Sequence, residues 1–298
     1  MSAANLLAPH FQDADKARAY LEALRWPDGA ICPHCGSIEA HYKLQGKATR
    51  PGLWKCKDCR KQFTVIVGTV FSDSKIPLNK WLLAVHLICA SKKAMSSHQL
   101  HRMLGVTYKS AWFMTHRIRE AMKSANGGLL GSGGGVVEAD ETYWGNQGKK
   151  PQGARGYQHK MKIVSLVERG GEKRSVVVSN VNAKTLRVVI DANVCKSANL
   201  MTDEHSGYTK IGREFASHGL TVHSQGEYAR GEIHSNTVES SFSLLKRGLI
   251  GTFHHVGEQH LQRYVTEFDY RWNNRKITDK ERSDKLLAQV AGKRLKYN

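Results

Sequence analysis

Three acidic residues stand in segments that could bring them to one site. Asp140 lies in the run Val-Val-Glu-Ala-Asp-Glu-Thr-Tyr, Asp203 lies in Leu-Met-Thr-Asp-Glu-His, and Glu239 lies in Asn-Thr-Val-Glu. Two aspartates on strands and a glutamate on a later helix can supply the hard oxygen ligands that Mg²⁺ or Mn²⁺ prefers. Two such ions position a water or a hydroxyl for in-line attack on a phosphodiester. The three acids therefore indicate metal-dependent phosphodiester chemistry.

The segment 234–247 predicts the start of a helix, because good N-cap residues precede apolar residues at helical spacing. Glu239 and Lys246 are seven residues apart, which places them on one face about 10 Å from each other. The same segment also fits a capping box, in which Glu239 would bond back to the backbone of Asn236. Both interpretations stay open from this segment alone.

Four of the six cysteines form two Cys-x-x-Cys pairs: Cys32 with Cys35 and, twenty residues further on, Cys56 with Cys59. Four thiolates at this spacing predict a closed, tetrahedral, structural Zn²⁺ site. A redox dithiol is the less favoured alternative, because two matched pairs are present. Short hairpin strands are expected around the pairs, at 42–44, 53–55 and 62–65.

The charge of the chain points to a polyanionic partner. It carries 45 Lys and Arg against 26 Asp and Glu, a formal net charge of +19. Nucleic acid fits such a surplus better than a membrane surface, although a merely soluble basic protein is the alternative. No apolar run is long enough to predict a transmembrane helix, and the first residues do not resemble a secretory signal. The expected location is the cytoplasm, in association with the nucleoid.

Residues 76–123 predict three helices, with a Gly-Val-Thr turn at 105–107 between the last two. This order is typical of a helix-turn-helix that binds DNA, and a plain three-helix packing unit is the alternative. The outer face of the last helix would present to a major groove Tyr108, Lys109, Trp112, His116, Arg117 and Arg119.

The composition divides the chain into five parts. A helix at 1–27 precedes a zinc ribbon at 28–70 and the helical domain at 71–123. A glycine-rich segment, 124–135, is expected to be a flexible linker to a last domain, 136–298. The chain as a whole is therefore predicted to be a multidomain α/β protein.

The last domain alternates strands with helices. The expected strands are 136–143, 162–168, 175–181, 199–203 and 220–223, and the expected helices before the one that carries Glu239 are 185–194 and 208–216. This order matches the ribonuclease-H-like fold, a mixed five-stranded sheet with helices. In that fold the first and fourth strands are neighbours, so Asp140 and Asp203 would meet.

With these motifs the chain resembles bacterial insertion-sequence transposases of the DDE type, in the ISXO-type branch with an N-terminal zinc ribbon. The resemblance rests on the cysteine pairs, Asp140-Glu-Thr-Tyr, Thr202-Asp-Glu-His-Ser-Gly-Tyr and the segment 234–247, and it covers nearly the whole chain. It implies that Asp140 and Asp203 are metal ligands and that Glu239 is the third carboxylate. An asparagine can stand at the third position in this branch, which makes Asn236 a second candidate.

Such an enzyme would nick DNA at the ends of a mobile element and transfer the freed 3′-hydroxyl into target DNA, as a homo-oligomer on DNA. Lys246 would match the basic residue two turns after the glutamate. We expect Lys149, Lys150 and Arg247 to contact phosphates, although the basic loop that holds the first two is equally typical of a solvated loop. Two other functions stay open: a ribonuclease-H-like nuclease without strand transfer, and a non-catalytic zinc-ribbon DNA-binding regulator.

Overall fold

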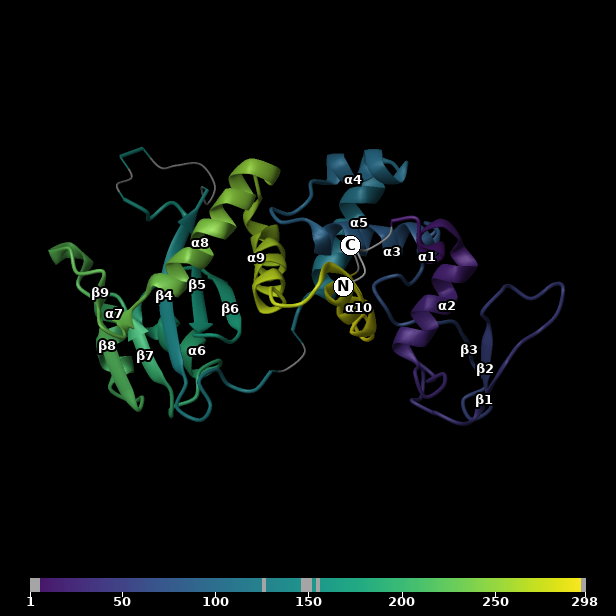
Figure 1. Ribbon diagram of the computed structural model, residues 1–298, viewed down its shortest axis with the longest axis horizontal. Helices are drawn as coiled ribbons and strands as arrows, with labels where there is room; N and C mark the ends of the chain where they lie inside the picture. The colour runs from purple at the N-terminus through teal and green to yellow at the C-terminus, as the bar shows by residue number, and fades with distance from the viewer. Residues whose placement is uncertain (1–5, 125–126, 146–151, 154–155, 296–298) are drawn as a thin grey trace. The chain divides into compact units, whose positions relative to one another are not determined.

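The chain forms two compact units in a computed structural model that describes residues 6–124, 127–145, 152–153 and 156–295 (Figure 1). The ribbon unit comprises residues 1–122 together with 277–298, and the sheet unit comprises residues 123–276. Among the described residues, no helix has the length and apolarity needed to cross a membrane.

The ribbon unit begins with two short helices where the sequence predicted one. Asp13 interrupts them and caps the second, because its side chain accepts bonds from the amides of Asp15 and Lys16 at 2.8 Å. An antiparallel three-stranded sheet follows, in the order β1-β2-β3. The bounds are α1 Pro9–Gln12, α2 Ala14–Arg25, β1 His41–Lys43, β2 Trp54–Cys56 and β3 Gln62–Phe63.

Three helices follow at the predicted positions, with bounds α3 Leu78–Ala90, α4 Ser97–Leu104 and α5 Tyr108–Ala121. Gly105 ends α4 in the left-handed conformation, at φ 59°, which a glycine adopts without strain. Thr107 then caps α5 by accepting a bond from the amide of Ser110 at 3.1 Å. A DNA-binding role for α4 and α5 stays a prediction.

The predicted last domain extended too far along the chain, because α10 (Asp279–Ala288) packs against α3 and α2 in the ribbon unit. Leu286 and Leu287 are buried, and Arg282 Nη1 donates to the carbonyl of Cys89 at 2.7 Å. The apolar side chains of this short helix gave no sign in the sequence of which unit they would cover.

The sheet unit is built on a five-stranded sheet in the order β6-β5-β4-β7-β8. Its first three strands are antiparallel, whereas β4, β7 and β8 run parallel. This mixed sheet fits a ribonuclease-H-like domain, as predicted. The strands are β4 Val136–Trp144, β5 Met161–Glu168, β6 Lys173–Val178, β7 Asn199–Thr202 and β8 Ser217–Leu220, and a small pair is formed by β9 Ala229–Arg230 and β10 Ile233–His234.

Helices cover both faces of this sheet. Figure 1 shows α8 (Asn236–Gly248) lying across β4 and β5, and α9 (Glu258–Asn273) packs on β6 of the same face. The side chains of α6 (Ala183–Asp191) and α7 (Ser206–Gly212) form the main core of the unit with the opposite face. A helical turn, η1 (His223–Gln225), precedes α8, and a π-helical turn, η2 (Leu249–Phe253), follows it.

Two further expectations for the sheet unit were wrong. The fifth strand lies at 217–220 and not at 220–223, because its backbone pairs with β7 in a register that starts at Ser217. The glycine-rich segment is not a free linker: Leu130 is buried in the core, and its amide donates to the carbonyl of Asn193 at 2.8 Å. A Cβ on Gly131 would lie 2.4 Å from the Cβ of Ala198, so close packing requires glycine there.

Candidate active site

The first two acids lie where β4 and β7 run side by side in parallel, Asp140 within β4 and Asp203 directly after the last residue of β7. Glu138 of β4 pairs with Met201 of β7, and Asp140 and Asp203 each stand two residues further along. Burial raises the pKa of Asp140 to about 8, and the charges of Asp203 and Glu141 add to this effect. An anionic Asp140 is therefore costly here unless a cation is close by.

Glu239 belongs to the same electrostatic cluster, because its charge also contributes to the raised pKa of Asp140. It lies in the first turn of α8, where its Oε1 accepts a bond from the hydroxyl of Ser235 at 3.0 Å and lies 3.6 Å from Nε2 of His223. His223 was not singled out from the sequence, because no motif surrounds it at the end of the expected strand 220–223.

The alternative capping-box interpretation of Glu239 is wrong. Ser235 occupies the N-cap position of α8 and makes no side-chain capping bond, and Asn236 is the exposed first residue of the helix. The Glu239 side chain bonds to the hydroxyl of Ser235, not to the backbone of Asn236. The carboxylate is thus not used as a cap.

A residue that the sequence analysis did not single out holds the start of α8. Glu138 is fully buried, and its Oε2 accepts bonds from the amides of Thr237 and Val238 at 2.8 and 2.9 Å. The sequence contained one signal: Glu138 lies two residues before Asp140, so in a strand the two acids face the same side of the sheet.

Glu141 faces the other side of β4 and makes a separate contact. The hydroxyl of buried Tyr208 donates to Glu141 Oε2 at 2.8 Å, and Nε2 of His205 lies 3.9 Å from Glu141 Oε1. Burial raises the pKa of Glu141, and the charge of Asp203 adds to the shift. This contact fixes α7 against the strand that carries Asp140.

Two of the remaining predicted residues of the sheet unit lie later on α8 than Glu239. Lys246 is half-buried near the end of α8, and Arg247 is exposed, with its Nε donating to the carbonyl of Ser243 at 3.1 Å. Lys149 and Lys150 lie outside the described residues.

The zinc-site prediction has direct geometric support. The four Sγ atoms of Cys32, Cys35, Cys56 and Cys59 all lie within 4.8 Å of one another. The Cys32–Cys59 and Cys35–Cys56 sulfur pairs are each 3.7 Å apart. Tetrahedral Zn²⁺ with Zn–S bonds near 2.3 Å requires sulfurs about 3.8 Å apart, so this donor set fits structural zinc. The described carboxylates form no equally tight group.

Three of the six residues predicted for a DNA groove do not lie on an outer face: His116, Arg117 and Arg119 are buried. Arg117 donates through Nη1 to the carbonyls of Val70 and Ser72 at 2.8 and 2.7 Å, so it serves packing within the ribbon unit. This part of the prediction was wrong, because helical spacing alone does not show which segment covers a basic side chain.

The other three remain accessible to different degrees. Tyr108 and Lys109 are exposed at the start of α5, and Trp112 is half-buried. The Tyr108 ring stacks on His98 of α4 at a centroid distance of 4.2 Å. Any contact of α5 with DNA would therefore be made by its first turn.

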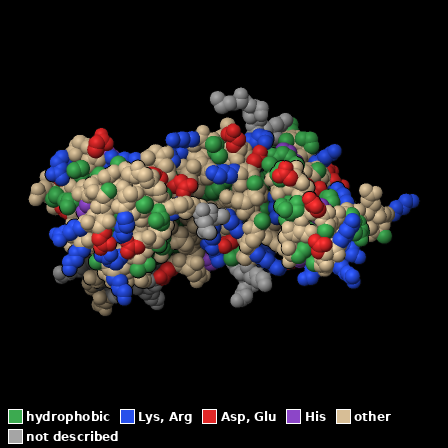
Figure 2. All heavy atoms as spheres, turned by 90° about the horizontal axis from the view of Figure 1, so that it is seen from below, with side chains coloured by type: hydrophobic (Ala, Val, Ile, Leu, Met, Phe, Trp, Pro, Cys, Tyr) green, Lys and Arg blue, Asp and Glu red, His purple; other side chains and the backbone are tan. Residues whose placement is uncertain are grey.

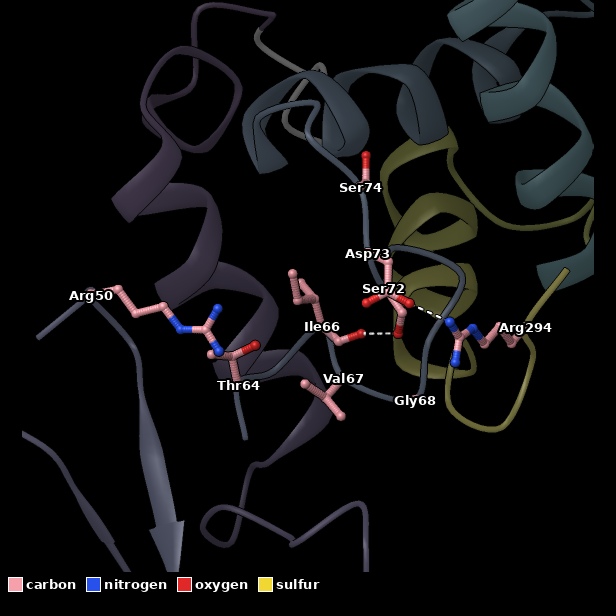
Figure 3. A pocket seen from close by; sticks show the side chains of 9 residues that line it. All are labelled: Arg50, Thr64, Ile66, Val67, Gly68, Ser72, Asp73, Ser74 and Arg294. Carbon is pink, nitrogen blue, oxygen red and sulfur yellow. Dashed lines mark hydrogen bonds and ion pairs between the residues drawn. The ribbon is translucent and has the colours of Figure 1, made fainter. Parts of the chain in front are cut away.

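The ribbon unit also contains a pocket of about 250 Å³, which is lined by residues of the segment 64–74 after β3 together with Arg50 and Arg294. Figure 3 shows Arg50 beside Thr64 on one side of it and Arg294 pointing toward Asp73 on the other, where the two form an ion pair. None of the predicted catalytic residues lines this pocket. Lys and Arg side chains recur across the molecular face in Figure 2, as the net charge of +19 requires.

Two family models match the chain. Residues 132–273 match the ISXO2-like transposase domain, and residues 12–62 match the transposase zinc-ribbon domain, which includes α2. An uncharacterized protein in transposable element ISH50 of Halobacterium salinarum is 28% identical over 277 residues, which cover 88% of this chain and 91% of that protein. The matched regions contain the four cysteines and all three acids.

Proposed function

Because the chain carries an ISXO2-like transposase domain behind a transposase zinc-ribbon domain, we propose that it catalyses metal-dependent nicking at the ends of a bacterial insertion sequence and strand transfer into target DNA. The observation that carries this proposal is the cluster of Asp140, Asp203 and Glu239 on two adjacent strands and the helix that lies over them.

The donor set suits divalent ions. The carboxylates of Asp140, Asp203 and Glu239 would hold Mg²⁺ or Mn²⁺, since hard oxygen ligands without thiolates favour these ions. When bound, such ions polarise the phosphodiester and activate the attacking water or 3′-hydroxyl. A cation would also offset the burial, and the repulsion from Asp203 and Glu141, that together raise the pKa of Asp140 to about 8.

The surrounding residues have supporting roles in this proposal. The rigid pairing of β4 with β7 holds the two aspartates, and α8 brings Glu239 to them and presents Lys246 further along toward DNA. Asn236 lies one turn before Glu239 and is the alternative third ligand. Tyr108, Lys109 and the zinc ribbon would contact the element ends. The enzyme would act as an assembly of copies on double-stranded DNA.

A joining assay tests the proposal. Purified protein, DNA duplexes taken from the regions that flank the gene and ending in a free 3′-hydroxyl, a target plasmid and Mg²⁺ should yield covalently joined product. Asp140→Asn should remove both nicking and joining while duplex binding persists. Cutting without any joined product would instead identify a nuclease, and unaltered function in Asp140→Asn would identify a DNA-binding regulator.

A further inference from the structure

The carboxylate of Glu138 is completely buried and takes part in five polar contacts. Its Oε2 accepts the amides of Thr237 and Val238. Its Oε1 accepts the hydroxyl of Thr237 at 2.9 Å and Nε of Arg169 at 2.6 Å, and it lies 3.3 Å from Nδ1 of His234. Such complete satisfaction is what a buried charge requires, because an unpaired one would be strongly destabilising.

These contacts make Glu138 the cap of α8, supplied from a distant strand. Thr237 and Val238 are the second and third residues of the helix, whose amides an N-cap side chain ordinarily satisfies. The local N-cap residue, Ser235, forms no such bond and gives its hydroxyl to Glu239. The negative charge of Glu138 also interacts favourably with the positive end of the helix dipole.

The same carboxylate fixes the chain that enters α8. Arg169 bonds to Glu138 and also donates to the carbonyls of Glu232 and His234 at 2.8 and 3.0 Å. The entry segment and the first turn of the helix are therefore held by the ion pair between half-buried Arg169 and the buried carboxylate of Glu138.

The position of Glu138 couples this cap to the catalytic cluster. Glu138 and Asp140 are two residues apart on β4 and face the same side, so their separation is set by the strand itself. Glu239 directly follows Val238, and its own amide bonds to the carbonyl of Ser235 at 3.1 Å. A shift or rotation of the α8 start would thus move Glu239 relative to Asp140.

We propose that Glu138 is a positioning residue. It sets where α8 places the carboxylate of Glu239 relative to Asp140, and thereby sets the affinity of the site for a divalent metal. This inference rests on the proposed function, since it assigns the metal to the three acids. Glu138 itself contacts neither metal nor DNA in this role.

The test compares Glu138→Gln with the wild-type full-length chain. Glutamine keeps the size of the side chain but has no charge. Its NH₂ group would face N–H and O–H donors that bond to the carboxylate in the wild type. We expect the Mn²⁺ concentration for half-maximal joining to rise about tenfold or more, as it does for residues that orient metal ligands. Mn²⁺ binding measured by electron paramagnetic resonance should weaken equally, and the Thr237 and Val238 amides should exchange faster with solvent.

Two controls separate positioning from stability. Val167→Ala removes an apolar contact with Val238 and Phe242 of the same helix but leaves the cap in place, so it should lower the Tm without changing the Mn²⁺ requirement. Glu232→Gln removes an exposed carboxylate that also contacts Arg169, and it should change neither the Tm nor the Mn²⁺ requirement. If Glu138→Gln does not fold, Thr237→Val removes one bond to Glu138 and should raise the Mn²⁺ requirement about fivefold at most.

The outcomes are distinct. A raised Mn²⁺ requirement in Glu138→Gln or Thr237→Val, but not in Val167→Ala, supports the inference. Equal requirements in these variants and in the wild type overturn it. If the wild type neither nicks nor joins DNA, the proposed function fails, and the Mn²⁺-binding comparison alone decides: weaker binding in Glu138→Gln supports the positioning role, and unchanged binding overturns it.

Discussion

The hydroxyl of Ser235 donates to the carboxylate of Glu239 at 3.0 Å, within the first turn of α8. Ser235 is the N-cap residue of α8, but its side chain bonds to Glu239 and makes no bond to the helix backbone. The helix start is then stabilised by Glu138 from β4. Glu239 is therefore not needed as a backbone cap, and its charge acts on Asp140 in the cluster with Asp203.

Glu239→Gln should lower joining at least about a hundredfold, because loss of a ligand should exceed the 10- to 100-fold effect of residues that merely orient one. The free energy of unfolding should change by less than about 1 kcal/mol, since the amide oxygen can still accept the Ser235 bond. A joining assay and thermal unfolding measure the two effects. Asn236→Ser is the matched variant at the exposed first position of α8 and should retain activity. Full activity in Glu239→Gln together with loss in Asn236→Ser would transfer the ligand role to Asn236.

The zinc site should hold one Zn²⁺ per chain. Removal of the metal by a chelator, or Cys35→Ser, should unfold the segment around β1–β3, because metal binding contributes folding energy in so small a module. Elemental analysis measures the zinc content, and the amide signals of this segment in an NMR spectrum report whether it is folded. Cys195→Ser should keep the metal, since Cys195 lies in the sheet unit and is half-exposed. A metal-free protein with an intact ribbon would rule the site out.

The basic residues of α5 should separate into binding and packing groups. Lys109→Ala should weaken duplex binding and reduce the slope of log K against log salt by about one, because an exposed lysine that contacts phosphate releases one counterion. Arg117→Met should instead cost about 2 kcal/mol of stability, since it deprives the buried carbonyls of Val70 and Ser72 of a donor. Salt-dependent binding and denaturant unfolding test the pair. An unchanged salt slope in Lys109→Ala would remove α5 from the DNA interface.

A buried ion pair connects β6 to α9 in the sheet unit. Lys173 Nζ lies 3.5 Å from Asp269 Oδ1, which also accepts the hydroxyl of Ser175 at 2.8 Å. Burial lowers the pKa of Lys173 and raises the pKa of Asp269, so each charge depends on the other.

Lys173→Met should therefore cost about 3–5 kcal/mol, because it leaves a buried carboxylate without its partner. The double variant Lys173→Met with Asp269→Leu should recover most of that loss, since neither charge then remains buried. Urea unfolding of the two variants and the wild type gives the values. Equal losses in the single and the double variant would show that packing volume, not charge, sets the cost.

The sequence by itself determined the features that depend on local spacing. Two Cys-x-x-Cys pairs bring four sulfurs together wherever the hairpin forms, because each knuckle is a short turn. The alternation of strands and helices after residue 135 matched the element order of the ribonuclease-H-like fold, and that resemblance implied that Asp140 and Asp203 are neighbours. The first turn of α8 was predictable because capping residues and apolar spacing coincide at 235–245.

Only the tertiary structure decided which distant groups meet. Helical spacing placed Arg117 on an outer face, but the segment around Val70 and Ser72 covers it. Apolar spacing did not show that Leu286 and Leu287 of α10 would pack with α3, or that Leu130 would enter the core of the sheet unit. Glu138 had no assigned role until α8 brought two unsatisfied amides to it across 99 and 100 residues of chain. Burial and partner choice are properties of the folded chain, because a side chain's neighbours in space are set by packing between elements and not by its neighbours in sequence.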